Sequence, residues 1–383
     1  MENRKTVLFL DHSPVLGGAE FSLIQLMIGL DSRGWDVHLA CPQGQLFDKT
    51  AERSLHAHVI NFPRLRRSMR FWKDINKTPF QIYKLASKLE ARCLVANTVR
   101  AAIFTRFSSS RFRLPWIWYM RDFWLSESRP RYPQWDYLGK RILGSNAAQI
   151  ITNSHAVSEN LHLKEKVRVV HNGIDVDAYI PQANQEFLQK YNIPRDAVVI
   201  SMAARLRPWK GTDRFIRMAA ELVKEHQNVY FLVVGGTPFE IADGYAESLL
   251  DLAKTLGVAD KCIFTGQLND IRPALSATDV FVHPGDPEPF GRVIIEAMAM
   301  QLPVVAFNHG AAPEIILNEK TGKLVAPGDE NGLLRAVLEL MRSPVKRIQF
   351  GIAGRAHTEK AFDENRMIEE VSSILLENFR FRS

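Results

Sequence analysis

The chain has 383 residues, which is long enough for two domains that each bury a core of their own. With 46% hydrophobic and 24% charged residues, the composition is that of a globular protein and excludes a disordered chain. The net charge of +7 fits an anionic substrate, an acidic membrane surface or a nucleic acid, and it does not distinguish among these partners.

The first residues predict a strand and not a membrane anchor. Only four consecutive apolar residues, 7–10, precede Asp11 and His12, and no stretch approaches the ~18–20 residues that a bilayer span needs. We therefore expect a cytosolic protein. The three cysteines are odd in number and far apart, so we expect buried thiols and neither a disulfide framework nor a zinc site.

Short apolar runs alternate with longer helical patterns along the chain. This alternation predicts buried parallel strands joined by crossover helices. The runs of the first half are 7–10, 37–40, 93–96 and 116–119, and those of the second half are 198–200, 229–234, 262–264, 280–282 and 304–306.

The two sets of runs predict two α/β domains. We expect the first domain at residues 1–178 and the second at 179–362, with a hinge in the segment 175–194. The last amphipathic pattern, from about 363 to 383, predicts a helix that joins the first domain. Because ligands of open parallel sheets bind beyond the carboxyl ends of the strands, we expect one cleft between the two sheets.

A basic segment with aromatic residues lies in the first half, at residues 64–73. It contains Arg64, Arg66, Arg67, Arg70, Phe71, Trp72 and Lys73 and no acidic residue. Basic and aromatic side chains in this mixture suit an anionic bilayer surface or a phosphorylated acceptor. A solvated loop is the interpretation that we favour over membrane contact, since most charge runs are simply exposed.

The stretch 283–300 is the most informative in the chain. Gly291 opens a helix whose free N–H groups favour an anion, and Glu288 and Glu296 lie on either side of it. Much of this helix is apolar, so the carboxylate of Glu296 should meet a polar partner. The alternative is that Arg292 pairs with Glu296 on a solvated face.

The pattern E-P-F-G-x-x-x-x-E-A in this stretch resembles the signature of retaining nucleotide-sugar glycosyltransferases of family four. Further motifs follow in the family's order along nearly the whole chain, and the ordered set is more specific than any one of them. These motifs are Gly17-Gly18-Ala19-Glu20, His171-Asn172-Gly173-Ile174-Asp175, Arg205 with Lys210-Gly211, Gly235-Gly236, Gly266, Pro313-Glu314-Ile315-Ile316 and Thr321-Gly322.

The resemblance implies a GT-B fold, with two Rossmann-like domains that face a central cleft and a final helix that returns to the first domain. It also implies a site for a nucleotide diphosphate sugar in which Arg205 and Lys210 neutralise the diphosphate, without a metal or other cofactor. Glu288 would contact the sugar hydroxyls and Glu296 the ribose. The remaining donor contacts would come from Gly17, Gly18, Gly235, Gly266, Phe290 and Gly291.

The sequence departs from the family at Arg121, which occupies the place of a histidine, and at Ala311, where a second glycine is common. An arginine cannot act as a general base, but it can bind a sugar or an anionic acceptor. Asp122 could serve as the base. A simpler hypothesis is that the leaving phosphate takes the acceptor proton while Arg121 positions the reactants. Pairing of Arg121 with Asp122 beside a loop is the structural alternative.

The resemblance thus predicts a retaining transferase that moves a sugar, with UDP as the expected nucleotide, to a hydroxyl of a glycan or lipid-linked acceptor. Bacterial surface polysaccharide or glycolipid assembly is the expected setting, on the cytoplasmic side of the membrane with peripheral contact as one option. A nucleotide-sugar epimerase and a protein that binds without turnover are the rivals. A dehydrogenase, a glycoside hydrolase and a nucleic-acid-binding protein fit the sequence less well. We interpret three histidines near strand ends as structural residues: His12, His171 and His283.

Overall fold

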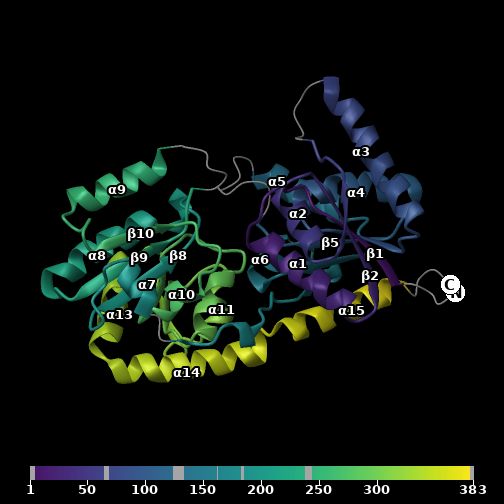
Figure 1. Ribbon diagram of the computed structural model, residues 1–383. Coiled ribbons are helices and arrows are strands. Elements are labelled where there is room, and N and C mark those ends of the chain that lie inside the picture. Colours follow the sequence, from purple (N-terminus) through teal and green to yellow (C-terminus); the bar gives the residue numbers. More distant parts are fainter. Residues whose placement is uncertain are drawn as a thin grey trace. The chain divides into compact units, whose positions relative to one another are not determined.

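The computed structural model describes residues 5–63, 69–123, 133–161, 163–182, 185–237 and 244–379. The chain divides into two compact units, which we describe separately (Figure 1). Unit 1 consists of Met1–Gly173 and Glu364–Ser383, and unit 2 consists of Ile174–Asp363. The chain enters unit 2 at Ile174, slightly before the boundary expected between 178 and 179. Ile174 is fully buried in a core of unit 2 and donates its N–H to the carbonyl of Phe362 at 3.0 Å.

Unit 1 contains a parallel sheet whose described strands follow the order β3-β2-β1-β4-β5-β6-β7. The strands are β1 (Lys5–Leu10), β2 (Trp35–Cys41), β3 (His56–Val59), β4 (Cys93–Ala96), β5 (Trp116–Met120), β6 (Gln149–Thr152) and β7 (Val167–Val169). The helices are α1 (Gly18–Asp31), α2 (Gln45–Glu52), α3 (Met69–Lys88), α4 (Val99–Phe112), α5 (Pro133–Gly144), α6 (His155–Leu161) and α15 (Glu364–Phe379), with a short 3-10 turn at Lys164–Lys166.

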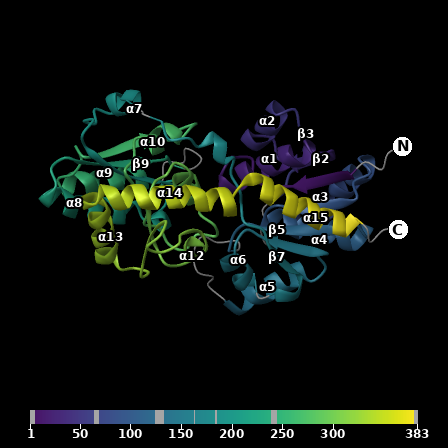
Figure 2. The same ribbon diagram turned by 90° about the horizontal axis from the view of Figure 1, so that it is seen from below.

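Helices cover both faces of this sheet, which explains why its central strands are apolar on both sides. Phe9 of β1 packs with residues of α1 and α15 in one core, whereas Leu8 packs with residues of α3 and α4 in the other. The final helix α15 belongs to unit 1 and lies against α1 (Figure 2). Trp35 of β2 donates its indole N–H to Ser372 of α15 at 3.1 Å, so the end of the chain completes the core of unit 1.

Unit 2 contains a second parallel sheet, whose described strands follow the order β10-β9-β8-β11-β12-β13. The strands are β8 (Val198–Ala203), β9 (Val229–Val234), β10 (Cys262–Gly266), β11 (Val280–His283), β12 (Val304–Phe307) and β13 (Gly322–Val325). The helices are α7 (Gln185–Lys190), α8 (Thr212–Glu225), α9 (Tyr245–Thr255), α10 (Arg272–Ser276), α11 (Arg292–Ala299), α12 (Ala312–Ile315), α13 (Glu330–Arg342) and α14 (Pro344–Ala361), and 3-10 turns lie at Val176–Ala178 and Pro208–Lys210.

Both faces of this sheet are buried as well. Val282 of β11 packs with residues of α8, α9 and α13 on one face, whereas Phe281 packs with residues of α10, α11 and α12 on the other. The two sheets therefore confirm the prediction of two α/β domains with parallel strands.

Two further expectations concern anchors and cysteines. Over the described ranges, every helix is too short or too polar to cross a bilayer. Cys41, Cys93 and Cys262 are buried free thiols, as the sequence predicted.

Candidate functional site

Each sheet has a point at which the chain order reverses, between β1 and β4 in unit 1 and between β8 and β11 in unit 2. At such a point the loops that follow the two strands leave toward opposite faces, and ligands of open α/β sheets bind between these loops. In both units, polar side chains meet directly after these strands. Each switch point is therefore a candidate for ligand binding.

Lys210 and Glu288 form an ion pair at the switch point of unit 2. Lys210 ends the turn that follows β8, and Glu288 lies in the loop that follows β11. Their side chains are only 13% and 11% exposed, and the Lys210 ammonium lies 3.9 Å from the ring centre of Trp209. A cation and a carboxylate are thus held together where a ligand of an open α/β sheet would bind.

His283 extends this pair. It is the last residue of β11, and its Nε2 lies 3.4 Å from the carboxylate of Glu288. Burial and then the charge of Lys210 lower the pKa of His283 to about 3, so the ring is neutral at pH 7. A neutral imidazole carries one N–H, which is available to Glu288. No sequence pattern indicated this contact, because an irregular loop joins residues 283 and 288.

Backbone contacts hold the Glu288 loop between its neighbours. Gly211 has φ +72°, and a Cβ there would lie 2.3 Å from the carbonyl oxygen of Pro284. Gly310 has φ +55°, and a Cβ there would lie 2.6 Å from the carbonyl oxygen of Glu288. The N–H of Ala311 donates to that same carbonyl at 3.0 Å. Only glycine allows the backbone at positions 211 and 310 to lie this close to the loop that carries Glu288. The loop is therefore held between these two segments.

Ala311, which departs from the family pattern, causes no strain in this frame. It is fully buried and has φ −84°, a right-handed conformation that any residue adopts. Alanine is therefore accommodated where a second glycine is common.

Helix α11 begins after Gly291, whose φ is +89°, and it places Glu296 against Arg292. Arg292 Nε lies 2.7 Å from Glu296 Oε1, and the two side chains are 16% and 10% exposed. Burial would lower the pKa of Arg292, but Glu296 and Tyr179 outweigh it and raise that pKa. Arg292 is thus the partner of Glu296, as the alternative interpretation expected. The pair is largely buried, however, and does not lie on a solvated face.

The remaining donor-site candidates of unit 2 lie around the same strand ends. Arg205 is exposed, and its guanidinium has no hydrogen-bond or ion-pair partner among the residues that the structure describes. Gly235 donates its N–H to the carbonyl of Gly266 at 3.1 Å, so these two glycines pack the loops after β9 and β10 against each other. The Phe290 side chain is buried in a core, where it meets Phe362 edge-on at 5.9 Å.

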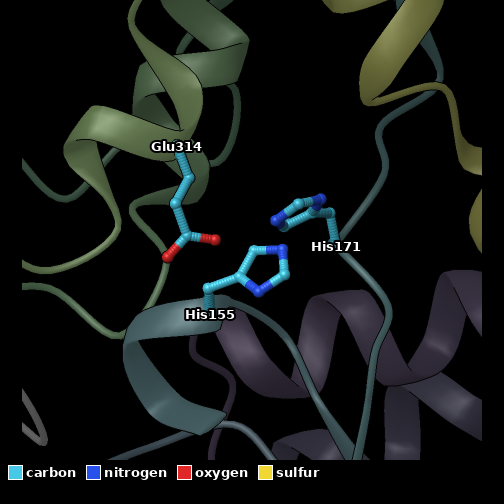
Figure 3. Close-up of side chains that lie close together, drawn as sticks. All are labelled: His155, His171 and Glu314. Atoms are coloured by element: carbon cyan, nitrogen blue, oxygen red, sulfur yellow. The ribbon is translucent and has the colours of Figure 1, made fainter. Parts of the chain in front are cut away.

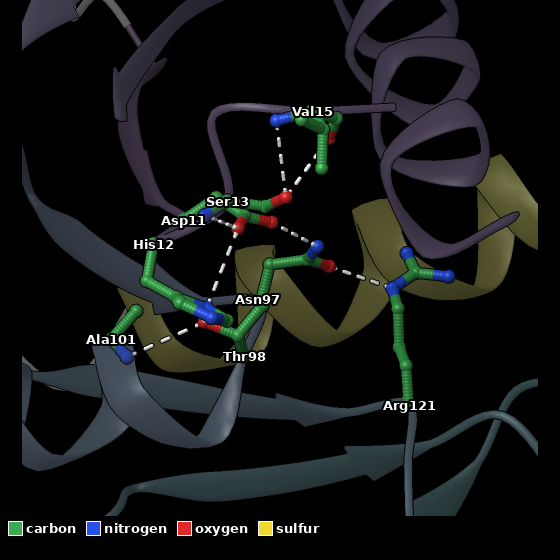
Figure 4. Close-up of polar contacts among 8 residues, drawn as sticks. All are labelled: Asp11, His12, Ser13, Val15, Asn97, Thr98, Ala101 and Arg121. Atoms are coloured by element: carbon green, nitrogen blue, oxygen red, sulfur yellow. Dashed lines mark hydrogen bonds and ion pairs between the residues drawn. The ribbon is translucent and has the colours of Figure 1, made fainter. Parts of the chain in front are cut away.

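A buried hydrogen-bond network occupies the switch point of unit 1 (Figure 4). Asp11, just after β1, accepts the N–H of Ser13 at 2.8 Å and the amide N–H of Asn97 at 2.7 Å. Asn97, just after β4, in turn accepts the Nε–H of Arg121 at 2.6 Å. Three neighbouring strands therefore contribute one polar residue each to a single network.

Arg121 makes further contacts, with Asn172 and Tyr119. Its Nη1 donates to the side-chain oxygen of Asn172 at 2.6 Å, and its guanidinium lies 3.7 Å from the ring centre of Tyr119. Asp122 is exposed instead, and its carboxylate accepts the N–H of Phe123 at 2.6 Å. The two adjacent candidates thus lie in different environments, with Arg121 buried and fixed and Asp122 at the surface.

Asp11 and Asn97 were not predicted as site residues, although both are polar residues directly after buried strands. Burial raises the pKa of Asp11 to about 6, against the hydrogen bond from Asn97 and the charge of Arg121, which favour the carboxylate. His12, beside it, bonds to Thr98 at 2.8 Å, and burial and then Arg100 lower its pKa to about 4. Asn172, in contrast, lies in the motif at residues 171–175 that resembles the family pattern.

Two other candidates of unit 1 lie nearby in the chain. Gly17 precedes α1, and a Cβ on Gly18 would meet no atom within 4 Å, so packing does not explain that glycine. His171 lies after β7, and its ring meets that of His155 edge-on, with centroids 5.7 Å apart (Figure 3).

Comparisons with known proteins identify two family models that match consecutive parts of the chain. The model described as Glycosyltransferase Family 4 matches residues 16–178, and the model described as Glycosyl transferases group 1 matches residues 183–357. Among solved structures, HepE of Anabaena, in complex with UDP and glucose, has a TM-score of 0.84 at 24% identity, covering 97% of this chain and 99% of its own. Sucrose-phosphate synthase from Thermosynechococcus elongatus has a TM-score of 0.84 at 20% identity, covering 99% and 100%.

Curated relatives match over shorter segments. A GDP-mannose-dependent alpha-(1-6)-phosphatidylinositol monomannoside mannosyltransferase of Mycolicibacterium smegmatis is 36% identical over 194 residues, which cover 48% of this chain and 49% of that protein. A D-inositol 3-phosphate glycosyltransferase of Saccharomonospora viridis is 29% identical over 241 residues, which cover 60% and 55%. The chain spans about half the length of the curated relatives that it matches.

The solved structures establish the fold, and it is the expected GT-B fold with two Rossmann-like domains. With both family models matched in order, the chain belongs to the family 4 glycosyltransferases and carries a glycosyl transferases group 1 domain in its second half.

Proposed function

We propose that the protein is a retaining glycosyltransferase that moves a sugar from a nucleoside diphosphate sugar to a hydroxyl of a glycan or lipid-linked acceptor. The observation that carries this proposal is the Lys210–Glu288 ion pair at the switch point of unit 2. The departing nucleoside diphosphate gains negative charge, which a fixed cation stabilises. Lys210 supplies that cation, with the exposed Arg205 as a second one.

Donor binding would divide the ion pair between two parts of the ligand. The diphosphate competes for the ammonium of Lys210, and the sugar hydroxyls donate to the carboxylate of Glu288, which His283 already contacts at 3.4 Å. Glu296, whose buried partner is Arg292, would accept from the ribose hydroxyls. Backbone N–H groups near Phe290 and Gly291 and the glycines at 17, 18, 235 and 266 would complete the donor contacts. We propose that no metal or other cofactor takes part.

In the transfer step, the bond between the anomeric carbon and the diphosphate oxygen breaks while the acceptor oxygen bonds to that carbon on the same face. The acceptor proton passes to the leaving phosphate oxygen. Arg121 is permanently charged, so it positions a reactant and does not act as the base. Its hydrogen bonds to Asn97 and Asn172 support this role, because they fix the guanidinium in one place.

The nucleotide of the proposed donor is UDP, and GDP is the competing nucleotide, because the M. smegmatis relative is named as GDP-mannose-dependent. The acceptors in the names of the relatives contain a phosphorylated inositol. A net charge of +7 suits an anionic acceptor of this kind, in surface polysaccharide or glycolipid assembly at the cytoplasmic side of a membrane. Of the basic segment at 64–73, residues 64–68 lie outside the described residues, and the side chains of Arg70–Lys73 are not described.

Nucleotide release tests the proposal. Purified protein is incubated with UDP-, GDP- and ADP-sugars and with lipid and sugar acceptors, and native protein is compared with Lys210→Ala and Glu288→Gln. We expect release from one donor that depends on an acceptor and is lost in both variants. Lys224→Ala, which removes an exposed lysine of α8, is the matched control and should keep native activity.

The rival functions give different results in the same assay. An epimerase would change the sugar and leave the nucleotide attached. A protein that binds without turnover would be stabilised by the nucleotide, by about 2.7 kcal/mol when the nucleotide is present at about 100 times its Kd, yet would release nothing. Either result would replace the proposed transfer.

A further inference from the structure

Three histidines and an aspartate lie together at the edge of the unit 1 sheet. Strands β2 and β3 are parallel neighbours in which His38 is paired with His56, and Ala40 with His58. Successive side chains of a strand alternate between the two faces. Asp36 and His38 of β2 and His56 and His58 of β3 therefore lie on the same face.

The His38 ring is fixed by two contacts. Its Nε2 lies 3.1 Å from Asp36 Oδ1, and its Nδ1 lies 3.0 Å from His58 Nε2. The other oxygen of Asp36 accepts the hydroxyl of Thr6 at 3.1 Å. A carboxylate at Nε2 holds the proton on that nitrogen, so the lone pair of Nδ1 faces His58.

His56 supplies a third imidazole beside these two. Its ring stacks on His38 with centroids 4.8 Å apart and an angle of 20° between the planes. The side chain is exposed, and its ring nitrogens make no hydrogen bond within the part of the chain that the structure describes. Rotation about its side-chain bonds is therefore free to bring a nitrogen toward the space between His38 and His58.

We propose that His38, His56 and His58 form a binding site for a divalent transition-metal ion of the zinc class. Such ions prefer imidazole nitrogen, at about 2.0–2.1 Å from the metal. Two nitrogens 3.0 Å apart are spaced as neighbouring ligands of one ion, once the proton on His58 Nε2 has moved through solvent to Nδ1 of the same ring, so that Nε2 presents its lone pair to the ion. Solvent would take the remaining position.

Asp36 acts in this site without touching the ion. Histidines that bind metals usually donate their second ring N–H to a carboxylate, which orients the ring and makes the ligand nitrogen more basic. The contact from Asp36 to His38 has that form, and Thr6 orients Asp36 in turn. The four residues thus provide ligands with a supporting hydrogen bond.

One charge opposes the ion. Lys88, exposed at the end of α3, acts electrostatically on His58. Removal of this charge should therefore strengthen metal binding. A pair of histidines that is merely hydrogen-bonded, the alternative interpretation, predicts no such response.

The site lies on β2 and β3, whereas the switch point of the same sheet lies between β1 and β4, and the proposed ion does not take part in sugar transfer. β3 is the edge strand of the sheet, paired only with β2 within the described residues. An ion bound to His38 and His58 would link the two strands and stabilise this edge. The histidines at 56 and 58 are separated by one residue, a spacing that places both on one face of a strand, so the sequence held this signal.

Metal titration of the full-length, untagged, chelator-treated protein tests the proposal. Co²⁺ binding is followed by its visible absorption, and Zn²⁺ affinity is measured by competition with a coloured chelator. We expect one equivalent to bind with nitrogen ligands and to raise the Tm. His58→Ala should abolish binding, and Asp36→Asn should weaken it about 10–100-fold. Lys88→Gln should strengthen it.

His56→Ala keeps the experiment decisive, because His56 is exposed and its replacement should leave the fold intact. Its affinity for Zn²⁺ should fall well below that of the native protein. The double variant His155→Ala with His171→Ala is the control for the other histidine pair of unit 1 and should bind as the native protein does. Equal affinity of native protein and His56→Ala, or loss of binding in the control, would overturn the proposal.

Discussion

The Lys210 ammonium contacts the Glu288 carboxylate across the switch point of the unit 2 sheet, between loops that follow neighbouring strands. Both side chains are largely desolvated, so each charge depends on the other while no ligand is present. A ligand that separates them must offer a negative group to Lys210 and hydrogen-bond donors to Glu288. A nucleoside diphosphate sugar has both.

The first prediction concerns this pair. Lys210→Ala should lower kcat for transfer by about 10²–10³-fold, because a preorganised donor to the developing charge is lost. Activity is measured per folded protein, since the variant also leaves Glu288 desolvated without its cation. Lys224→Ala, on the exposed side of α8, should change neither kcat nor Tm appreciably. An unchanged kcat in folded Lys210→Ala would exclude Lys210 from the transfer step.

The second prediction compares two glycines with positive φ. Gly310→Ala should lower both Tm and donor affinity, because its Cβ would lie 2.6 Å from the Glu288 carbonyl oxygen and must move that loop. Gly328 has φ +79° and no atom within 4 Å of a Cβ. Gly328→Ala should therefore cost only the backbone strain, about 1–2 kcal/mol, and leave donor affinity unchanged. Equal losses of donor affinity in the two variants would contradict the proposed role of the loop.

The third prediction concerns His283. His283→Phe keeps a ring at the end of β11 but removes the N–H beside Glu288, and it should weaken donor affinity by about tenfold, the effect of one hydrogen bond. His283→Gln carries an amide N–H and should recover part of the loss. Because burial keeps the pKa of His283 at about 3, activity should show no titration of this ring between pH 5 and 8. A titration that disappears in His283→Gln would contradict this interpretation.

The sequence predicted the two parallel sheets because strands buried on both faces are apolar throughout, and this pattern depends only on local composition. The family resemblance in the sequence assigns Lys210 and Glu288 to the donor site, which stays a prediction. It did not predict their contact with each other, because which strands are neighbours depends on the topology. β8 and β11 adjoin in the sheet, although 76 residues separate Ala203 from Val280.

The same limit explains the network around Arg121. The sequence placed Arg121 correctly after a strand, and pairing with the adjacent Asp122 was its structural alternative. In the structure, the side-chain oxygens of Asn97 and Asn172, 24 and 51 residues away in the chain, accept hydrogen bonds from Arg121. Neither asparagine carries a charge that would have marked it as a partner. Long-range hydrogen bonds of this kind are fixed by strand order and not by local pattern.

The fourth prediction removes the centre of that network. Asn97→Ala leaves the Asp11 carboxylate and the Arg121 guanidinium each without one buried hydrogen bond, which should cost about 1–3 kcal/mol or more of stability. Thermal unfolding measures the loss. Asn228→Ala, whose amide bonds to Asp196 at the surface, is the matched control and should change stability by less than about 0.5 kcal/mol. Equal Tm values for the two variants would show that the network does not stabilise unit 1.

The fifth prediction uses the charge of Asp11. Burial raises the pKa of this carboxyl from 3.8 to about 6, so between these values the folded protein holds a proton that the unfolded chain has lost. The free energy of unfolding should therefore fall as pH rises through this range and level off above about 6. Asp11→Asn lacks this dependence. Relative to the variant, native protein should lose about 2 kcal/mol between pH 4.5 and pH 7.5.

Thermal unfolding of both proteins from pH 4.5 to 7.5 checks this sign. The groups that act on Asp11 do not titrate within the window in which it changes charge: His12 has a pKa of about 4, Arg121 stays charged, and burial raises the pKa of the Cys41 thiol to about 12. The loss of the Asn97 hydrogen bond in Asp11→Asn adds a constant difference at every pH. A Tm difference between the two proteins that does not change with pH would show that Asp11 keeps an ordinary pKa. In that case the hydrogen bond from Asn97 and the charge of Arg121 together would offset the whole effect of burial on this pKa.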